Sequence, residues 1–168
     1  MLKSMMKYLP ALAWLAMTLL DSSAARAEDA VKRGEYLVHV ISCGDCHTPG
    51  SLAGKPDMAR YLGGSSIGFE IPGLGIFYPS NLTPDPETGL GKWSESDIVA
   101  ALRTGVRPDG RELAPIMPWR SFAGLTDSDA HAIAAYLKSL PPVANAAPAP
   151  VGPTEKAPAP YLTVVMPN

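Results

Sequence analysis

The sequence predicts a small all-α domain with long irregular connections. Apolar residues recur at the three- and four-residue spacing of amphipathic helices over residues 29–42, 94–105 and 126–140. Residues 48–92 and 107–120 instead contain frequent Gly and Pro and show no regular period. With 168 residues, the chain has room for one such domain, or for one domain and a tail.

The first 27 residues are organised like a secretory signal peptide. Lys3 and Lys7 form a positive start, residues 8–20 form an apolar run, and Ala25 and Ala27 supply a small-residue cleavage site. We expect cleavage after Ala27 and export to the periplasm. The apolar run is shorter than the roughly 20 residues that span a membrane. No transmembrane span is therefore expected in the mature chain.

The charge distribution argues against nucleic acid as a partner. The chain carries 14 Lys and Arg residues against 16 Asp and Glu residues, a formal net charge of −2, and contains no basic run. A modest acidic excess also keeps ordinary proteins soluble, so charge alone identifies no protein partner.

Residues 29–42 predict an amphipathic helix that ends just before the first cysteine. Its apolar stripe consists of Val31, Gly34, Leu37, Val38 and Ile41. A glycine inside a helix costs about 1 kcal/mol relative to alanine, so Gly34 suggests that another helix crosses closely there. His39 lies on the same helix, where we expect an exposed side chain and not a metal ligand.

Cys43–His47 reads Cys-Gly-Asp-Cys-His, the signature of covalent haem c attachment. Each thiol forms a thioether with a haem vinyl group, and His47 ligates the iron from one side. A thioredoxin-like pair would follow a strand, whereas this motif follows a predicted helix. A zinc site needs about four ligands, but outside the motif the chain has no Cys and only His39 and His131. The single motif predicts one covalent haem c, attached at Cys43 and Cys46.

The long loop over residues 48–92 is expected to cover the edge of the haem. Loops of this length usually wrap a ligand or form a binding element. Three of its apolar residues should then pack on the porphyrin: Leu74, Ile76 and Phe77. Pro72 or a nearby backbone carbonyl is expected to accept a hydrogen bond from the second ring nitrogen of His47, which would orient the ring.

A second helix follows Trp93. Ser94 is its N-cap, Asp97 suits its positive end, and Gly105 is its C-cap. Two side chains here have alternative roles. Trp93 either donates its indole N–H to a haem propionate or covers the rim of the core, and Arg103 either pairs with a propionate or lies in solvent.

The second loop, residues 107–120, contains the methionine best placed to complete the iron coordination. Removal of the signal peptide leaves three methionines: Met58, Met117 and Met166. Met58 lies too near His47 in sequence to reach the opposite face of a haem, and Met166 lies in a Pro-rich terminus. Prolines flank Met117 and restrict its backbone. We expect Met117 to ligate the iron; the alternative is that it fills a gap in the core.

The last predicted helix, residues 126–140, has the clearest signals. Thr126 caps it, and two prolines stop it at residue 141. Ala134 and Ala135 should allow close approach by the helix that carries Gly34. We expect His131, one turn inside this helix, to face solvent.

The composition changes after this helix. Residues 144–168 are rich in Pro and Ala, which favours extended conformations. Residues 161–166 are apolar and suggest a short strand that docks on the domain or on a partner subunit, the alternative being a disordered end. The predicted organisation is a signal peptide (1–27), a haem domain (28–143) and a C-terminal tail (144–168).

Six stretches together resemble class I c-type cytochromes. They are CGDCH at 43–47, NLTPDPETGLG at 81–91, WSESDI at 93–98, RTGVRPDG at 103–110, MPW at 117–119 and LKSLPPV at 137–143. More narrowly, they are similar to the domains in cytochrome subunits of bacterial membrane-associated alcohol, aldehyde and gluconate dehydrogenases. The resemblance implies an all-α class I fold, with N- and C-terminal helices crossing beside one covalent haem and a long loop wrapping it. It also implies attachment at Cys43 and Cys46, with His47 and Met117 as axial ligands.

The resemblance further implies an exported monohaem electron carrier, not an enzyme. Such a protein passes single electrons from a periplasmic dehydrogenase to a downstream cytochrome or terminal oxidase of a respiratory chain. It does so as a free carrier or as the electron-transfer subunit of a dehydrogenase. The alternative is a haem enzyme or ligand sensor, in which Met117 packs elsewhere and the sixth iron position is open or labile.

Overall fold

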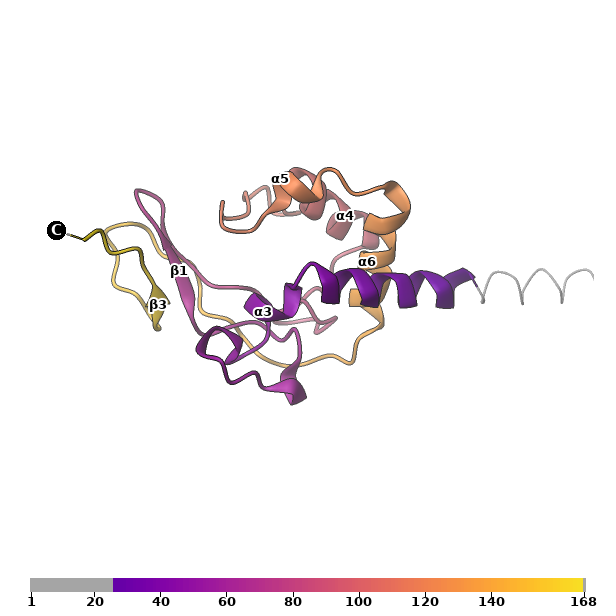
Figure 1. Cartoon of the computed structure of the whole chain (residues 1–168), viewed down its shortest axis with the longest axis horizontal. Coiled ribbons are helices and arrows are strands. Elements are labelled where there is room, and N and C mark those ends of the chain that lie inside the picture. The colour runs from indigo at the N-terminus through magenta and orange to yellow at the C-terminus, as the bar shows by residue number, and fades with distance from the viewer. Residues whose placement is uncertain (1–25, 168) are drawn as a thin grey trace, which may run out of the picture.

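The computed structural model describes residues 26–167, so the predicted signal peptide falls almost wholly outside the described residues. Residues 26–40 are helical and lead directly into α3 (Cys43–His47). The remaining elements are η1 (Ser51–Ala53), η2 (Met58–Arg60), β1 (Gly68–Ile71), β2 (Gly75–Phe77), α4 (Glu95–Thr104), α5 (Trp119–Phe122), α6 (Asp127–Ser139) and β3 (Tyr161–Leu162) (Figure 1). None of the helices described here is both long and apolar enough to cross a membrane.

The N-terminal helix crosses α6 in close contact (Figure 1). A Cβ atom added at Gly34 would lie 1.9 Å from the carbonyl oxygen of Ala132 and 2.7 Å from Cβ of Tyr136. The predicted close crossing at Gly34 is therefore present. Its partners are Ala132 and Tyr136 and not Ala134 and Ala135, because α6 presents a different face to the glycine.

Local capping defines the helix ends as the sequence predicts. The Ser94 side chain accepts a hydrogen bond from Asp97 N, the Asp97 carboxylate accepts one from Ser94 N, and Gly105 ends α4 with a φ of 73°. The Thr126 side chain caps α6 by accepting from Asp129 N. Asp129 thereby lies at the start of α6, beside the N-terminal helix.

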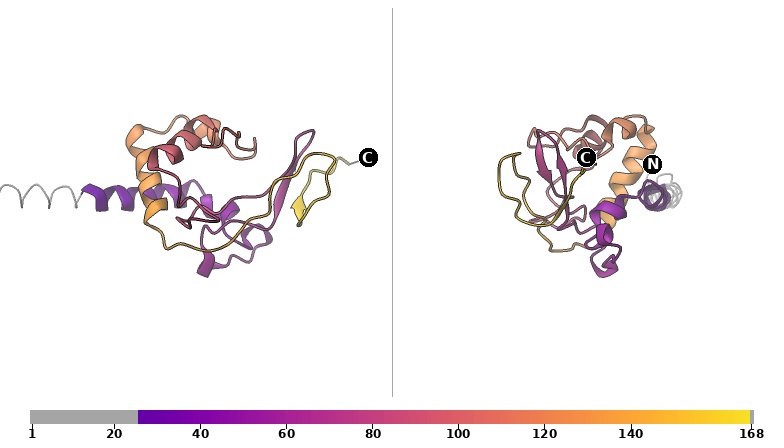
Figure 2. Two further views of the ribbon diagram at one scale, coloured as in Figure 1. Left: turned by 180° about the vertical axis from the view of Figure 1, so that it is seen from behind. Right: turned by 60° about the vertical axis from the view of Figure 1, so that its left-hand side comes forward.

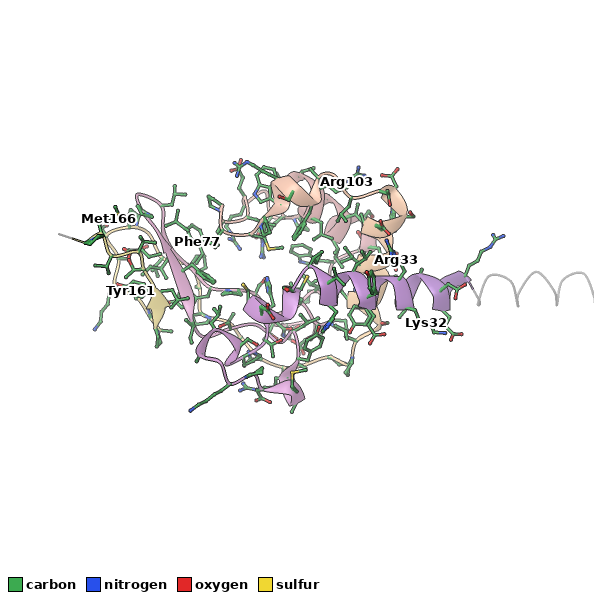
Figure 3. The ribbon with its side chains drawn as sticks, in the orientation of Figure 1. Lys32, Arg33, Phe77, Arg103, Tyr161 and Met166 are labelled. Carbon is green, nitrogen blue, oxygen red and sulfur yellow. The ribbon has the colours of Figure 1, made fainter. Side chains whose placement is uncertain are left out.

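Arg33, labelled in Figure 3, adds a polar contact across the helix crossing. Its Nε donates to Asp129 Oδ1 at 2.9 Å. Arg33 is half exposed, so this pair contributes at most about 1 kcal/mol. The crossing therefore depends mainly on apolar packing, in a core that includes Leu37, Val38, Ile98, Leu102, Ile133 and Leu137.

A small three-stranded sheet departs from the all-α prediction. Its order is β2-β1-β3, with β1 antiparallel to β2 and parallel to β3. Phe69 pairs with Phe77 in the hairpin, and Gly68 pairs with Tyr161 of the tail. Both views in Figure 2 place the last part of the chain beside the hairpin. The tail therefore docks on the domain, which is one of the alternatives that the sequence left open.

We predict that Gly34→Ala destabilises the protein, because its methyl group would overlap the backbone of α6. Overpacking of this kind costs about 1–3 kcal/mol, more than the roughly 1 kcal/mol that alanine gains in helix propensity. Chemical denaturation of the haem-loaded protein measures the difference. Gly124→Ala is the control, since the nearest atom to a Cβ there is 3.4 Å away, and we expect a change within about 0.5 kcal/mol. Equal stability of the two variants would contradict the crossing.

The same crossing predicts a loss of stability at high pH. Burial, reinforced by Tyr61 and Glu35, raises the pKa of Tyr136 to about 12 from its ordinary value of 10.0. The folded protein therefore keeps this phenol protonated in a range where the unfolded chain ionises. Its stabilising effect is complete below pH 10 and disappears as the pH rises towards 12. Free energies of unfolding measured between pH 8 and 12 should fall less steeply for Tyr136→Phe than for the wild type; parallel curves would contradict this.

Candidate functional site

One cavity of about 470 Å³ lies between α3, the β1–β2 hairpin, α4, α6 and the segment before α5. This volume is within the range of about 300–1,000 Å³ that is typical of small-molecule and cofactor sites. The lining is mainly apolar and comes from separate parts of the chain, as in Phe77, Leu82, Leu102, Phe122, Ile133 and Leu137. The cavity therefore depends on the tertiary fold, although each contributing segment is short.

The short helix α3 presents all three reactive side chains of the Cys43–His47 motif to this cavity. Positions i, i+3 and i+4 of a helix lie on one face, which is why Cys43, Cys46 and His47 point the same way. Burial raises the pKa of the Cys43 thiol to about 11 and also raises that of Cys46. Thiols with raised pKa values are protonated at neutral pH, unlike the low-pKa thiolates of disulfide oxidoreductases.

The imidazole of His47 is buried and held in one orientation. Its Nδ1 lies 2.7 Å from the carbonyl oxygen of Ser80. Burial lowers the pKa of His47, partly offset by this hydrogen bond, so the ring is neutral at pH 7. Because a carbonyl only accepts, Nδ1 carries the proton and Nε2 keeps the lone pair that binds a metal. The acceptor is a backbone carbonyl of the predicted loop, that of Ser80, which lies later in the chain than Pro72.

Met117 lines the same cavity from the segment before α5. In Figure 1 the segment that leads into α5 lies above α3. Met117 is held in a turn, since its N–H donates to Ala114 O at 2.9 Å. The other two candidates are 63% and 76% exposed at Met58 and Met166 and do not line the cavity. Among the described methionines, therefore, only Met117 shares the cavity with His47.

Two arginines that the sequence reasoning passed over also reach the cavity. Arg107 lies over the Trp93 ring, 5.1 Å from Cζ to the ring centroid, and pairs with Asp109 at 3.4 Å. Burial, and then the charge of Arg107, lower the pKa of Arg111. The two guanidinium groups make a positive site in the mainly apolar wall. Both arginines lie in the same loop as Met117, residues 107–120, and this proximity in sequence is the signal that would have identified them.

The remaining sequence candidates, apart from Trp93, lie outside the cavity lining. Arg103, labelled in Figure 3, forms an ion pair with Asp127 on the surface and does not line the cavity. Trp93 does line the cavity, under Arg107. His39 and His131 are exposed and lie outside the lining. Over residues 26–167, no three His, Cys, Asp or Glu side chains are grouped to hold a metal ion.

The loop residues expected to touch the porphyrin are only partly where the sequence placed them. Phe77 lines the cavity, but Leu74 is 51% exposed at the hairpin turn. Ile76 is buried outside the cavity lining, because neighbouring residues of a strand point to opposite faces. Phe69, which was not predicted, takes its place on the cavity side of the hairpin.

Comparison with known proteins identifies the family to which this chain belongs. The chain matches the family model described as Cytochrome c over residues 31–141. It is 40% identical over 141 residues to the cytochrome c subunit of the quinone alcohol dehydrogenase of Gluconobacter oxydans, covering 80% of this chain and 28% of the relative. It is 38% identical over 144 residues to the gluconate 2-dehydrogenase cytochrome c subunit of Pantoea cypripedii, covering 84% and 31%.

A third relative, the fructose dehydrogenase cytochrome subunit of Gluconobacter japonicus, is 35% identical over 114 residues, covering 68% of this chain and 22% of the relative. The matched part of this chain thus spans less than a third of each of these three relatives. The family model, in contrast, matches most of this chain and includes the Cys43–His47 motif and Met117. The chain therefore belongs to the cytochrome c family.

Proposed function

We propose that this protein is a monohaem c-type cytochrome that transfers single electrons. The observation that carries the proposal is that Cys43, Cys46, His47 and Met117 line one apolar cavity of cofactor size. Membership of the cytochrome c family supports a covalently bound haem c as the group that this cavity takes. When bound, the haem supplies one-electron chemistry by alternating between ferric and ferrous iron.

Each of the four side chains has a distinct task in this proposal. Cys43 and Cys46 would hold the haem through thioether bonds, and His47 would bind its iron through Nε2. The carbonyl of Ser80 keeps the His47 ring in the required orientation and tautomer. Met117 would supply a thioether sulfur to the iron, a ligand that raises the reduction potential relative to a second histidine.

The arginine pair supplies the polar complement of this site. Arg107 and Arg111 are the cationic side chains of the described cavity wall, and haem carries two propionates. We place Arg107 and Arg111 at these carboxylates, with Trp93 supporting the Arg107 guanidinium from below. This assignment replaces Arg103, whose guanidinium is engaged by Asp127.

The proposed setting is the bacterial periplasm. A signal peptide cleaved after Ala27 would deliver a mature chain with a haem domain over 28–143 to the compartment where haem c is attached. The relatives are named as cytochrome subunits of alcohol, gluconate and fructose dehydrogenases. We therefore place a periplasmic dehydrogenase as electron donor and a cytochrome or terminal oxidase as acceptor, with this chain as a free carrier or a dehydrogenase subunit.

Replacing the proposed sixth ligand tests the proposal directly. We predict that Met117→Ala keeps the covalent haem but loses the sulfur-to-ferric-iron charge-transfer band, and that its ferrous form binds carbon monoxide. Visible spectra of both oxidation states measure this. Met58→Ala is the control and should retain the band and resist carbon monoxide, because Met58 is exposed outside the cavity. A wild type that lacks the band and binds carbon monoxide fully would instead identify a ligand sensor or haem enzyme.

The arginine assignment makes a separate prediction. A nearby positive charge favours the ferrous haem, because ferrous haem carries one positive charge fewer than ferric haem. Arg111→Gln removes such a charge, so the reduction potential should fall. Arg103→Gln is the matched control, because it removes the same charge from the surface pair with Asp127. Redox titration of the holoproteins measures both shifts. A shift in Arg103→Gln as large as that in Arg111→Gln would contradict the assignment.

A further inference from the structure

The C-terminal tail is attached to the haem domain along most of its length. We call residues 144–162 the strap. The side chain of Asn145 donates to Gly63 O at 2.7 Å, and its backbone N–H donates to Thr88 Oγ1 at 3.2 Å, which fixes the start of the strap. The family match ends at residue 141, so the strap lies beyond the part of the chain that the family model describes.

Further along, the strap holds both outer edges of the β1–β2 hairpin. Val151 and Ile76 exchange two backbone hydrogen bonds of 2.9 and 3.0 Å on the free side of β2. On the other side, β3 of the strap pairs with β1. The Tyr78 hydroxyl adds a bond of 2.8 Å to Ala159 O. An isolated two-stranded hairpin is only marginally stable, so these contacts give the hairpin much of its support.

The hairpin that the strap holds is also a wall of the haem cavity. Phe69 and Phe77 are paired in register and both line the cavity, and Pro150 of the strap lines it as well. Phe77 and Tyr161 are labelled together at the sheet end of the molecule in Figure 3. The strap therefore contributes to the cavity in two ways, through Pro150 and through the position of the hairpin.

We propose that the strap is part of the haem site, and that it holds the hairpin wall closed and keeps water from that edge of the haem. This inference rests on the proposed function, since it requires the haem to occupy the cavity. The apolar surroundings of a metal control the access of solvent, and with it the reduction potential. Water that enters at a loosened wall favours the ferric haem, because the ferric form carries one more positive charge. An intact strap thus raises the reduction potential.

Gly75 allows the strap to be detached by one methyl group. A Cβ at Gly75 would lie 2.0 Å from the carbonyl oxygen of Val151, so Gly75→Ala should push the strap from β2. Gly73→Ala is a matched control in the same hairpin. Both glycines have positive φ, 122° and 78°, but a Cβ at Gly73 meets no atom within 4 Å. A second pair compares truncation after residue 143, which removes the strap, with truncation after residue 162, which keeps it.

The experiment measures the reduction potential and the charge-transfer band of each holoprotein, with hydrogen exchange at Val151 as the report of strap release. We expect Gly75→Ala and truncation after residue 143 to lower the reduction potential while the charge-transfer band persists. The two controls, Gly73→Ala and truncation after residue 162, should match the wild type. An unchanged potential in Gly75→Ala, with Val151 exchanging freely, would overturn the inference and leave the proposed function intact. If the protein truncated after residue 143 does not fold, the comparison of Gly75→Ala with Gly73→Ala decides whether the inference holds. A wild type without covalent haem would overturn both proposals.

Discussion

The hydrogen bond from His47 Nδ1 to the Ser80 carbonyl is the contact on which the site most depends. It connects α3 to a loop residue 33 positions away and leaves Nε2 free to bind a metal. The adjacent Asn81 fixes that loop, because its buried amide accepts from Thr83 N and donates to Val143 O. One side chain therefore ties the orientation of the proposed iron ligand to the end of the folded domain.

The helix crossing places this contact within the molecule. Because Gly34 lets the N-terminal helix lie against the backbone of Ala132, α3 begins at a defined distance from α6. From α6, Ile133 and Leu137 reach the cavity, while Lys138 donates three hydrogen bonds to loop carbonyls, including that of Trp93. Helix α6 thus contributes apolar side chains to the cavity and also holds the segment that contains Trp93, on which Arg107 stacks. Packing far from the iron site fixes the shape that the haem must fit.

Features set by local sequence were predicted well, and features set by distant contacts were not. The shared face of the Cys43–His47 motif and the capped helices follow from neighbouring residues, and each is present. Gly34 indicated a close crossing, but the residues that it meets on α6, Ala132 and Tyr136, were not predicted. The choice of Ser80 over Pro72 depends on how a Gly- and Pro-rich loop folds, for which no periodic signal exists. The small sheet was missed for a similar reason, since β1 gains a partner 93 residues away, where Gly68 meets Tyr161. A periodic pattern describes single elements, whereas pairing of this kind depends on the whole chain.

Proton resonance of the reduced holoprotein, with the methionine methyl groups isotopically labelled, tests the central claim most directly. A methyl bound to haem iron lies over the porphyrin, where the ring current shifts its signal far upfield. The account predicts one such signal in the mature protein, absent from Met117→Ala and retained in Met58→Ala and in a variant lacking Met166. A spectrum without an upfield methyl, or one whose upfield methyl survives Met117→Ala, would contradict the assignment of His47 and Met117 as the ligands of an electron-carrying haem.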